Sequence, residues 1–334
     1  MMQPRRLVVV DSGLLATVQD LGRRGVGALG VSPSGAVDWY SARAANRLVG
    51  NPDGCPLIET TMNGAAFDAT ARMTIALTGA DAPMWIGGKR RSSWCSHVIE
   101  AGDRLLIGPA TAGLRSYIAV DGGFEVQHVL GSAATDVGGG FGGLKLRPGD
   151  PLRLAIDSPP EVMTVSEYDP GAIPAMRQPF VLRVLAGPDA LRLGPAVVDE
   201  LLAATFRGSA RSSRQGLRLD GATIDGGASD AISAGVCAGC VQLPGDGSPI
   251  VLLAEHQTTG GYPVALCVIT ADIPLAAQVR PGDEVRFERV DRAGARAALA
   301  TVGERLRAIR ALASVRVDSG AGRLGRGFSE GASL

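Results

Sequence analysis

The sequence predicts a mainly β protein with two similar β units, a few short helices and a C-terminal helix. Glycine accounts for 46 of 334 residues, about twice the usual share of roughly 7%. Apolar runs are short and alternate with turn residues, as expected for many short strands. A Pro-Gly-Asp or Ala-Gly-Asp turn precedes a predicted strand at residues 101–103, 148–150 and 281–283. The last two copies lie near the ends of the two halves, which indicates a duplicated β unit.

Turn-forming residues also divide the chain into domains. Residues 1–155 form the predicted N-terminal β unit, which begins with a strand at residues 5–10 and contains a short helix at residues 37–49. Residues 156–179 carry several prolines and are predicted to be a linker. A second β unit follows over residues 180–290, with a helix at about residues 195–204.

The end of the chain predicts one helix and a tail. Over residues 291–316, Leu299, Val302, Leu306 and Ile309 recur at helical spacing with arginines opposite them. Such a helix either packs on its own domain, which we favour, or offers its apolar stripe to a partner. Residues 317–334 are rich in glycine and serine and lack a stripe, so we expect a disordered tail.

Composition argues against several classes of function. The chain has 33 basic and 33 acidic residues and 4% aromatic residues, so neither a charge field nor stacking surfaces predict a nucleic-acid partner. No apolar stretch approaches the roughly 20 residues of a membrane span, and we expect no secretory signal. Five scattered cysteines favour the reducing cytoplasm. Lysine occurs only at Lys89 and Lys145, so a lysine nucleophile has two candidates.

The segment QTTGGYP at residues 257–263 is the most informative stretch of the chain. It lies between the apolar runs 250–253 and 264–269, which are probable strands by composition alone. Gln257, Thr258 and Thr259 supply hydrogen-bonding groups, and two glycines let a ligand approach the main chain closely. A ligand-binding loop and a simple hairpin turn explain the pattern equally well.

Other constellations carry weaker signals. Cys237 and Cys240 have the spacing of a redox or half-zinc site, but neither a second ligand pair nor a helix start accompanies them, and we expect no metal. His256 borders the QTTGGYP segment without forming a metal-type pair. Residues 138–143 resemble a phosphate-binding glycine loop but lack its lysine and the following helix. Residues 211–216 suit a carboxylate or phosphate as well as they suit a solvated turn.

A series of short motifs nevertheless runs through the chain in one order. They are TVQD at 17–20, GR at 22–23, LIE at 57–59, ALTGA at 76–80, RSY at 115–117, AVDGG at 119–123, TD at 135–136 and QTTGGYP at 257–263. Together they resemble the biotin-dependent carboxyltransferase-like family, which includes the C subunit of 5-oxoprolinase, allophanate hydrolase subunit 2 and KipA. Ala134, Ser213, Gln215 and Ala238 depart from the residues usual in the family, and these departures concern the substrate more than the fold.

The resemblance implies two cyclophilin-like β-barrel domains and a chain that works in a complex. It implies a KipI-like B subunit and an A subunit as partners, and a small amide as substrate. The first function implied is that of the C subunit of an ATP-dependent 5-oxoprolinase, a hydrolase that opens 5-oxo-L-proline to L-glutamate and is inactive as an isolated subunit. ATP would be used by the complex. The biotin-carrier motif alanine-methionine-lysine-methionine is absent, so biotin would come from another chain.

The positions of the motifs suggest functional roles for particular residues. The alternative for each residue is that it only makes a structural contact in a turn. Asp20, Asp136 and Gln257 are the candidate catalytic residues, because carboxylates can serve as general bases and an amide can pair with the substrate amide. The candidate substrate-binding residues are Thr17, Gln19, Arg23, Arg115, Arg214, Thr258, Thr259, Gly260, Gly261 and Tyr262. Among these, the arginines suit a carboxylate and the threonine-glycine backbone suits a developing oxyanion.

Two alternative functions stay open at this point. The chain resembles carboxyltransferase and allophanate hydrolase subunits of urea breakdown as well. It also resembles KipA-like regulators that bind a KipI-like kinase inhibitor. The motifs do not separate these hypotheses, and Gln19 and Gln257 are expected to share one cleft if the chain is part of an enzyme.

Overall fold

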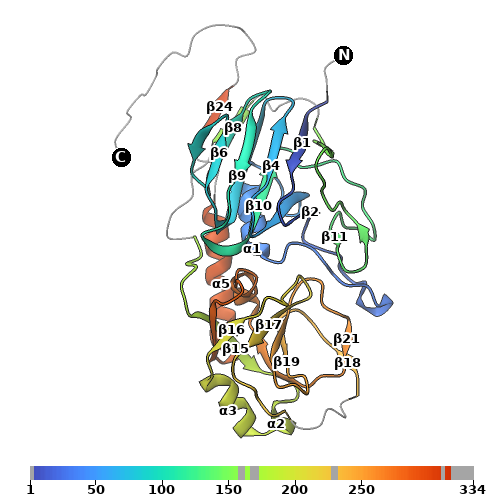
Figure 1. Cartoon of the computed structure of the whole chain (residues 1–334), viewed down its shortest axis with the longest axis vertical. Coiled ribbons are helices and arrows are strands. Elements are labelled where there is room, and N and C mark those ends of the chain that lie inside the picture. The colour runs from blue at the N-terminus through green and yellow to red at the C-terminus, as the bar shows by residue number, and fades with distance from the viewer. Residues whose placement is uncertain (1–3, 157–161, 166–172, 227–231, 310–312, 317–334) are drawn as a thin grey trace.

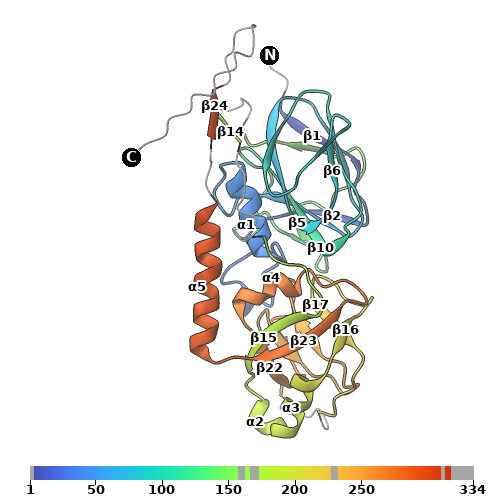
Figure 2. The same cartoon turned by 90° about the vertical axis from the view of Figure 1, so that its left-hand side faces the viewer.

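The computed structural model describes residues 4–156, 162–165, 173–226, 232–309 and 313–316. Two β units lie one above the other, and helix α5 (Arg292–Ala308) runs along one side of both (Figures 1 and 2). The mainly β prediction is confirmed. The predicted tail at residues 317–334 lies outside the described residues, as does much of the predicted linker.

Two antiparallel sheets form the N-terminal unit. The six-stranded sheet has the order β13 (Pro151–Arg153), β1 (Arg6–Asp11), β4 (Ala66–Ala69), β9 (Arg104–Ile107), β6 (Met84–Ile86) and β7 (Lys89–Arg91). The five-stranded sheet has the order β2 (Leu15–Gln19), β3 (Leu57–Thr61), β10 (Ala112–Val120), β5 (Met73–Asp81) and β8 (Ser96–Ile99). Inward residues of both sheets, such as Phe67 and Ile118, form one core. In β9, for example, buried and exposed positions alternate, which places one face of the strand in that core.

The C-terminal unit is a closed barrel of seven strands. Its order is β15 (Phe180–Ala186), β22 (Val264–Val268), β19 (Cys240–Gln242), β20 (Ile250–Leu252), β17 (Gly216–Asp220), β16 (Phe206–Gly208) and β23 (Glu284–Arg289). Parallel pairing of β15 with β23 closes the ring, which removes exposed sheet edges. Three short helices accompany it, namely α2 (Ala190–Leu193), α3 (Pro195–Ala203) and α4 (Ile273–Ala276).

Helix α1 (Trp39–Leu48) covers the outer face of the five-stranded sheet. Asp38 begins the helix, because its side chain accepts a hydrogen bond of 2.8 Å from the backbone N–H of Ser41. Ala44 and Ala45 are fully buried, and their small side chains let the helix approach the sheet closely. The helix therefore fixes the position of the preceding loop, residues 20–38, which runs between the two units.

The two units are joined by more than the linker. Val37 belongs to the core of the C-terminal barrel, although it precedes α1 of the N-terminal unit. Helix α5 begins on the C-terminal unit, where Ala298 packs with Ile269. It ends on the N-terminal unit, where Leu306 and Ile309 pack with α1 (Figure 2). Val302, Leu306 and Ile309 of the predicted stripe thus pack on their own chain, whereas Leu299 is 42% exposed.

Two predicted elements differ from the structure. The C-terminal helix ends at Ala308, and Ala313–Arg316 form strand β24, which pairs with β14 (Val162–Val165) inside the predicted linker. The β-branched residues Ile309 and Val315 favour extended backbone over helix. The QTTGGYP segment is not a hairpin, because β20 and β22 on either side of it both pair with β19 and not with each other. Among the described residues, none of the helices has the length and apolar character needed to cross a membrane.

Candidate functional site

A cleft of about 570 Å³ lies between the two units and is lined by both. From the N-terminal unit come apolar residues of β2 and β10, the turn at Val137 and Gly138, and Lys145. From the C-terminal unit come residues 212–215, which precede β17, and Glu255, which follows β20. Strand β17 begins and strand β20 ends at the interface between the units, so the polar residues beside these strand ends contact the N-terminal unit.

The inner wall of the cleft is a buried charge network centred on Arg214. Its Nε donates to Glu255 Oε1 at 2.6 Å, Nη2 donates to the carbonyl oxygen of Gly35 at 2.6 Å, and Nη1 donates to Glu59 Oε1. Glu59 also accepts hydrogen bonds from the Tyr117 hydroxyl at 2.9 Å and the Val37 backbone N–H at 3.0 Å. Arg214 therefore ties a carboxylate of each unit to the interdomain loop.

Arg115 and Gln278 make a second set of hydrogen bonds between the two units, beside this network. The Arg115 guanidinium donates to the carbonyl oxygen of Ala277, and its Nε lies 3.9 Å from Glu59 Oε1. Gln278 Oε1 accepts from the backbone N–H groups of Leu114 and Arg115 at 2.8 and 2.9 Å. Gln278 Nε2 donates to the carbonyl oxygen of Arg115 at 3.0 Å, so a single buried amide satisfies backbone groups of β10 where its pairing with β5 is interrupted.

Burial and charge compete in this network. Burial disfavours the charged form of Arg214, but Glu59 and Glu255 outweigh it and raise the pKa of Arg214. For Arg115 burial prevails over the attraction of Glu59, and its pKa is lowered. Burial, followed by the charge of Glu59, raises the pKa of Tyr117, so this hydroxyl stays a hydrogen-bond donor. The two arginines thus hold the wall together while their side chains still line the cleft.

Lys145 and Gln215 are two long polar side chains of the cleft that are open to solvent. Among the described residues, Lys145 makes no ion pair, so its ammonium group is free for a ligand. Gln215 also lines the adjoining small pocket described below, which places an amide between the two cavities. The cleft can therefore offer a cation and an amide to a small molecule, against apolar residues such as Leu114.

Five of the predicted site residues lie together in the first unit, around β2 and β11 (Thr135–Asp136). Gln19 is fully buried and its Nε2 donates to Thr17 Oγ1 at 3.0 Å. Both carboxylate oxygens of Asp20 are engaged, by Ser132 Oγ at 2.6 Å and by backbone N–H groups of residues 22 and 133. Arg23 stacks over Phe141 and donates to two backbone carbonyl oxygens. These side chains support the loop behind the cleft, although Gln19 Oε1 and Arg23 Nη1 are buried without a hydrogen-bond partner.

The glycine-rich run at residues 138–143 binds carboxylates of the protein itself. Glu255 accepts from the N–H groups of Val137 and Gly138 at 3.1 and 3.3 Å, and Asp136 accepts from the N–H of Gly139 at 2.6 Å. Gly142 has φ +75°, and a Cβ there would lie 2.0 Å from a nitrogen of Arg23. The glycines thus serve close packing, and the residues present do not fit an ATP phosphate at this loop.

The QTTGGYP segment lies on the C-terminal unit at a small pocket of about 240 Å³ that adjoins the cleft. Gln257 and Tyr262 line this pocket, and Gln257 Nε2 donates to Gln242 Oε1 at 3.0 Å. Thr259 and Gly260 form β21, which pairs with β18 (Ala234–Gly235). The carbonyl oxygen of Thr258 accepts a hydrogen bond from the N–H of Val236. Gly261 lies in the same segment. Gln19 takes no part in lining either pocket, so the structure does not bring it beside Gln257.

Sequence reasoning missed the roles of Glu59, Glu255 and Gln278. A usable signal was present for Glu59, since a carboxylate within an apolar strand is rarely buried without a partner. Glu255 closely precedes the QTTGGYP loop at the end of a buried strand. Gln278 has no comparable signal, because its partners are backbone groups of a distant strand.

The cysteine pair is closer to a third cysteine than the sequence suggests. Cys237 Sγ and Cys240 Sγ lie 3.6 Å apart across a turn. Cys240 is directly opposite Cys267 in the pairing of β19 with β22. The hydrogen bond between the two thiols lowers the pKa of Cys240 and raises the pKa of Cys237.

Comparisons with known proteins agree with this architecture. Residues 29–289 match the carboxyltransferase domain family, subdomain A and B. The C subunit of Escherichia coli 5-oxoprolinase is 35% identical over 295 residues, covering 84% of this chain and 90% of that protein. The urea amidolyase of Lachancea kluyveri is 33% identical over 312 residues, covering 85% of this chain but 17% of that protein.

Solved structures show the same relationship. The crystal structure of TTHA0988 has a TM-score of 0.79 at 34% identity, and the match covers 86% of this chain and 56% of that chain. The urea amidolyase of K. lactis has a TM-score of 0.83 at 26% identity, and the match covers 91% of this chain and 20% of that chain. This chain thus spans only part of these longer proteins. It belongs to the carboxyltransferase domain family, subdomain A and B, as its motifs predicted.

Proposed function

We propose that this chain is the C subunit of an ATP-dependent 5-oxoprolinase complex, a hydrolase that opens 5-oxo-L-proline to L-glutamate. The observation that supports this choice is the free cation in the interdomain cleft. 5-Oxoproline carries a carboxylate beside its cyclic amide, whereas urea carries none. A cleft with Lys145 at its rim and apolar residues behind it suits the former better. Similarity to the C subunit of the Escherichia coli 5-oxoprolinase over most of the chain supports the same choice.

In this proposal each residue group of the cleft has a distinct task. Lys145 holds the substrate carboxylate, and Gln215 pairs with the edge of the cyclic amide. The Arg115 and Arg214 network keeps the two units at a fixed separation around the substrate. Asp20 and Asp136 position the loop behind the cleft, because their carboxylate oxygens already accept protein hydrogen bonds. Placing the substrate against fixed groups lowers the entropic part of the barrier.

The partners and cofactors belong to the same proposal. A KipI-like B subunit and an A subunit would complete the active complex in the cytoplasm, and the isolated chain would be inactive. We assign ATP binding to another subunit, because the glycine-rich loop of this chain is occupied by Glu255 and Asp136. Likewise, neither lysine lies in a biotin-carrier motif, so any biotin would be attached to another chain.

The test is to co-express this chain with its A and B subunits and measure ATP hydrolysis and glutamate release. 5-Oxoproline should stimulate both, and Lys145→Ala should raise KM for 5-oxoproline by about tenfold or more, since a charged hydrogen bond contributes roughly 1.5–3 kcal/mol. Lys89→Ala is the matched control, because Lys89 is the other lysine and lies exposed in β7. Stimulation by urea but not by 5-oxoproline would overturn the proposal.

The second candidate is a subunit of a urea-degrading carboxyltransferase. The high structural similarity to the K. lactis urea amidolyase favours it. Urea has no carboxylate for Lys145 to bind, so this candidate predicts the same KM for urea in the Lys145→Ala variant and in the wild type. The two candidates therefore give opposite results in one experiment.

A further inference from the structure

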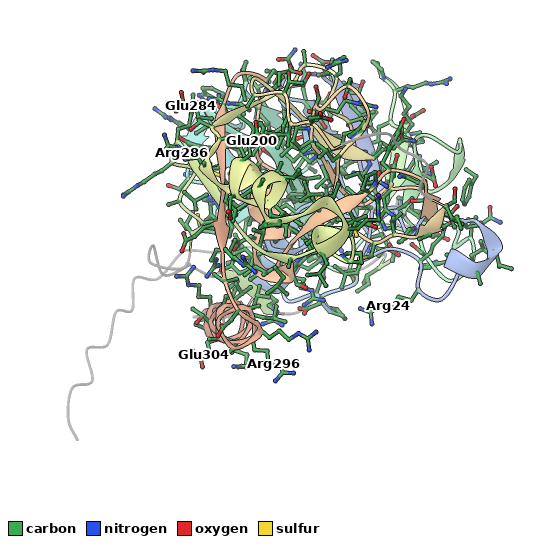
Figure 3. The ribbon with its side chains drawn as sticks, turned by 90° about the horizontal axis from the view of Figure 1, so that it is seen from below. Arg24, Glu200, Glu284, Arg286, Arg296 and Glu304 are labelled. Atoms are coloured by element: carbon green, nitrogen blue, oxygen red, sulfur yellow. The ribbon has the colours of Figure 1, made fainter. Side chains whose placement is uncertain are left out.

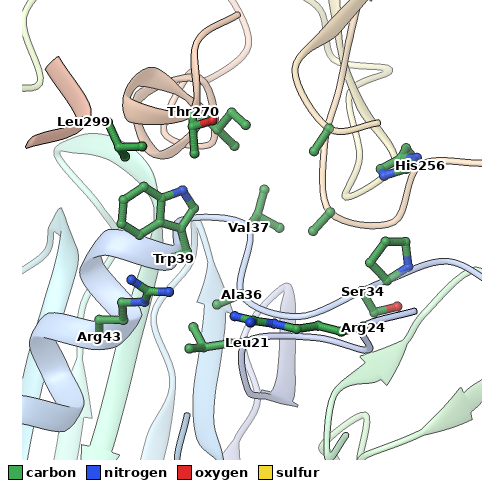
Figure 4. Close-up of a pocket in the computed structure, with 14 residues that line it drawn as sticks. Leu21, Arg24, Ser34, Ala36, Val37, Trp39, Arg43, His256, Thr270 and Leu299 are labelled. Atoms are coloured by element: carbon green, nitrogen blue, oxygen red, sulfur yellow. The ribbon is translucent and has the colours of Figure 1, made fainter. Parts of the chain in front are cut away.

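A second, separate cavity of about 410 Å³ also lies between the two units and is lined by both (Figure 4). The main chain after β20 passes between the two cavities. Glu255 lines the cleft, while its neighbours Ala254 and His256 line the second cavity. The interdomain loop and α1 form the other wall of this cavity, and Leu299 of α5 closes one end.

The cavity is positively charged. Arg24 and Arg43 line it, and no carboxylate of the described part of the chain does. Their guanidinium groups both extend into the same space below Trp39 and Val37 (Figure 4). Seen from below, Arg24 lies on the α5 side of the molecule, while Glu304 of α5 points away from it (Figure 3). Among the described residues, Arg24 makes neither a hydrogen bond nor an ion pair.

The acid that pairs with Arg43 is already engaged by another arginine. Asp53 receives two hydrogen bonds from Arg47, at 2.6 and 2.9 Å. Arg43 Nε forms an ion pair with Asp53 at 3.9 Å, beyond hydrogen-bonding distance, and this buried nitrogen has no hydrogen-bond partner. Burial, together with repulsion from Arg47 and Arg24, lowers the pKa of Arg43 despite the attraction of Asp53. Asp53 therefore balances one of the three positive charges of Arg24, Arg43 and Arg47, and the excess positive charge beside the cavity is the arrangement that binds oxyanions.

The rest of the cavity is apolar and could hold the body of a small molecule. Val37, Ala36 and Leu299 contribute aliphatic surface, and the indole of Trp39 supports the Arg43 guanidinium 5.0 Å from its ring centre. His256 is fixed by a contact of 2.6 Å between its Nδ1 and the carbonyl oxygen of Gln257. Since Nδ1 must donate to a carbonyl, Nε2 is left to accept a hydrogen bond from a ligand.

We propose that this cavity is a binding site for a small organic phosphate, with its phosphate on Arg24 and Arg43 and its apolar part against Val37 and Leu299. Two unbalanced positive charges suit the dianion of a phosphate monoester better than a single carboxylate. Forked guanidinium donors also match phosphate oxygens geometrically. The site is separate from the cleft assigned to the substrate, and the proposal holds whichever substrate that cleft takes.

The test is isothermal titration calorimetry on the full chain at low salt with three probes, namely phenyl phosphate, inorganic phosphate and benzoate. Phenyl phosphate should bind more tightly than either of the others, because it alone combines the dianion with an apolar ring. Arg24→Gln and Arg43→Gln should each weaken it by about tenfold or more. Arg24 is exposed and unpaired, so its replacement leaves the fold intact.

Two controls locate the binding. Arg6→Gln makes the same charge change at an exposed position of β1, outside the cavity, and should bind as the wild type does. Lys145→Ala should also bind normally, which separates this site from the cleft. Titration of phenyl phosphate should change the fluorescence of Trp39, and Trp39→Phe should abolish that change. Equal binding of benzoate, no binding of phenyl phosphate, or wild-type affinity in Arg24→Gln would each overturn the proposal.

Discussion

Removing Arg214 should destabilise the protein more than removing any surface arginine. Its side chain is 4% exposed and donates to Glu59, Glu255 and the carbonyl oxygen of Gly35. Arg214→Ala leaves two carboxylates, 1% and 3% exposed, without their main partner. Breaking a buried pair in this way costs about 3–5 kcal/mol. We therefore expect a loss of that size in the free energy of unfolding, measured by urea denaturation.

Arg211 provides a matched comparison three positions earlier. Its partner Asp220 lies at 3.1 Å, but the two side chains are 62% and 48% exposed, and such a pair contributes about 0–1 kcal/mol. Adding Glu255→Gln to Arg214→Ala should recover part of the loss, because one orphaned carboxylate becomes neutral. If Arg214→Ala costs no more than Arg211→Ala, the network does not hold the units together and the reasoning is wrong.

Three further predictions follow from other contacts. Gln278→Ala should lower the free energy of unfolding by about 2–4 kcal/mol, since it leaves two N–H groups of β10 without partners; a loss below that of Arg211→Ala would contradict this. Hydrogen bonding by Arg47 lowers the pKa of Asp53, so its stabilising effect is present above the ordinary value of about 3.9 and is lost as pH falls through the lower folded-state value. Denaturation at pH 7 and pH 3 should therefore show a smaller loss of stability in Asp53→Asn than in the wild type. One equivalent of hydrogen peroxide should convert the thiols of Cys237 and Cys240 to a disulfide and two waters, and peptide mass spectrometry should find no such link in Cys237→Ser.

The overall fold was predictable because its signals are local. Turns rich in glycine, short apolar runs and the capped helix after Asp38 each specify their own segment. The end of the last helix was not, because pairing of residues 313–316 with a strand of the linker is a contact between distant segments. The position of Val37 in the barrel core is also invisible in sequence, since a valine beside a helix start ordinarily belongs to its own domain.

The site was predictable in its segments but less so in its side chains. The motifs around Arg115 and Arg214 did lead to the interdomain cleft. Which way neighbouring side chains point was not encoded in the motifs. Arg23 is buried under the glycine-rich run, whereas the adjacent Arg24 lines the second cavity. Motif position alone selected the first of these two arginines, and only packing distinguishes them.

The course of α5 across both units has a mechanical consequence. Helix α5 packs on the C-terminal unit through Ala298 and on the N-terminal unit through Leu306, and so restricts movement between them. The buried hydrogen bonds of Gln278 to β10 hold the same two units together. Hinge-bending of one barrel against the other would have to break these contacts together. Under the proposed function, water would be kept from a bound substrate by a partner subunit rather than by closure of these two units. The interdomain cleft would then have the same shape before and after that subunit binds.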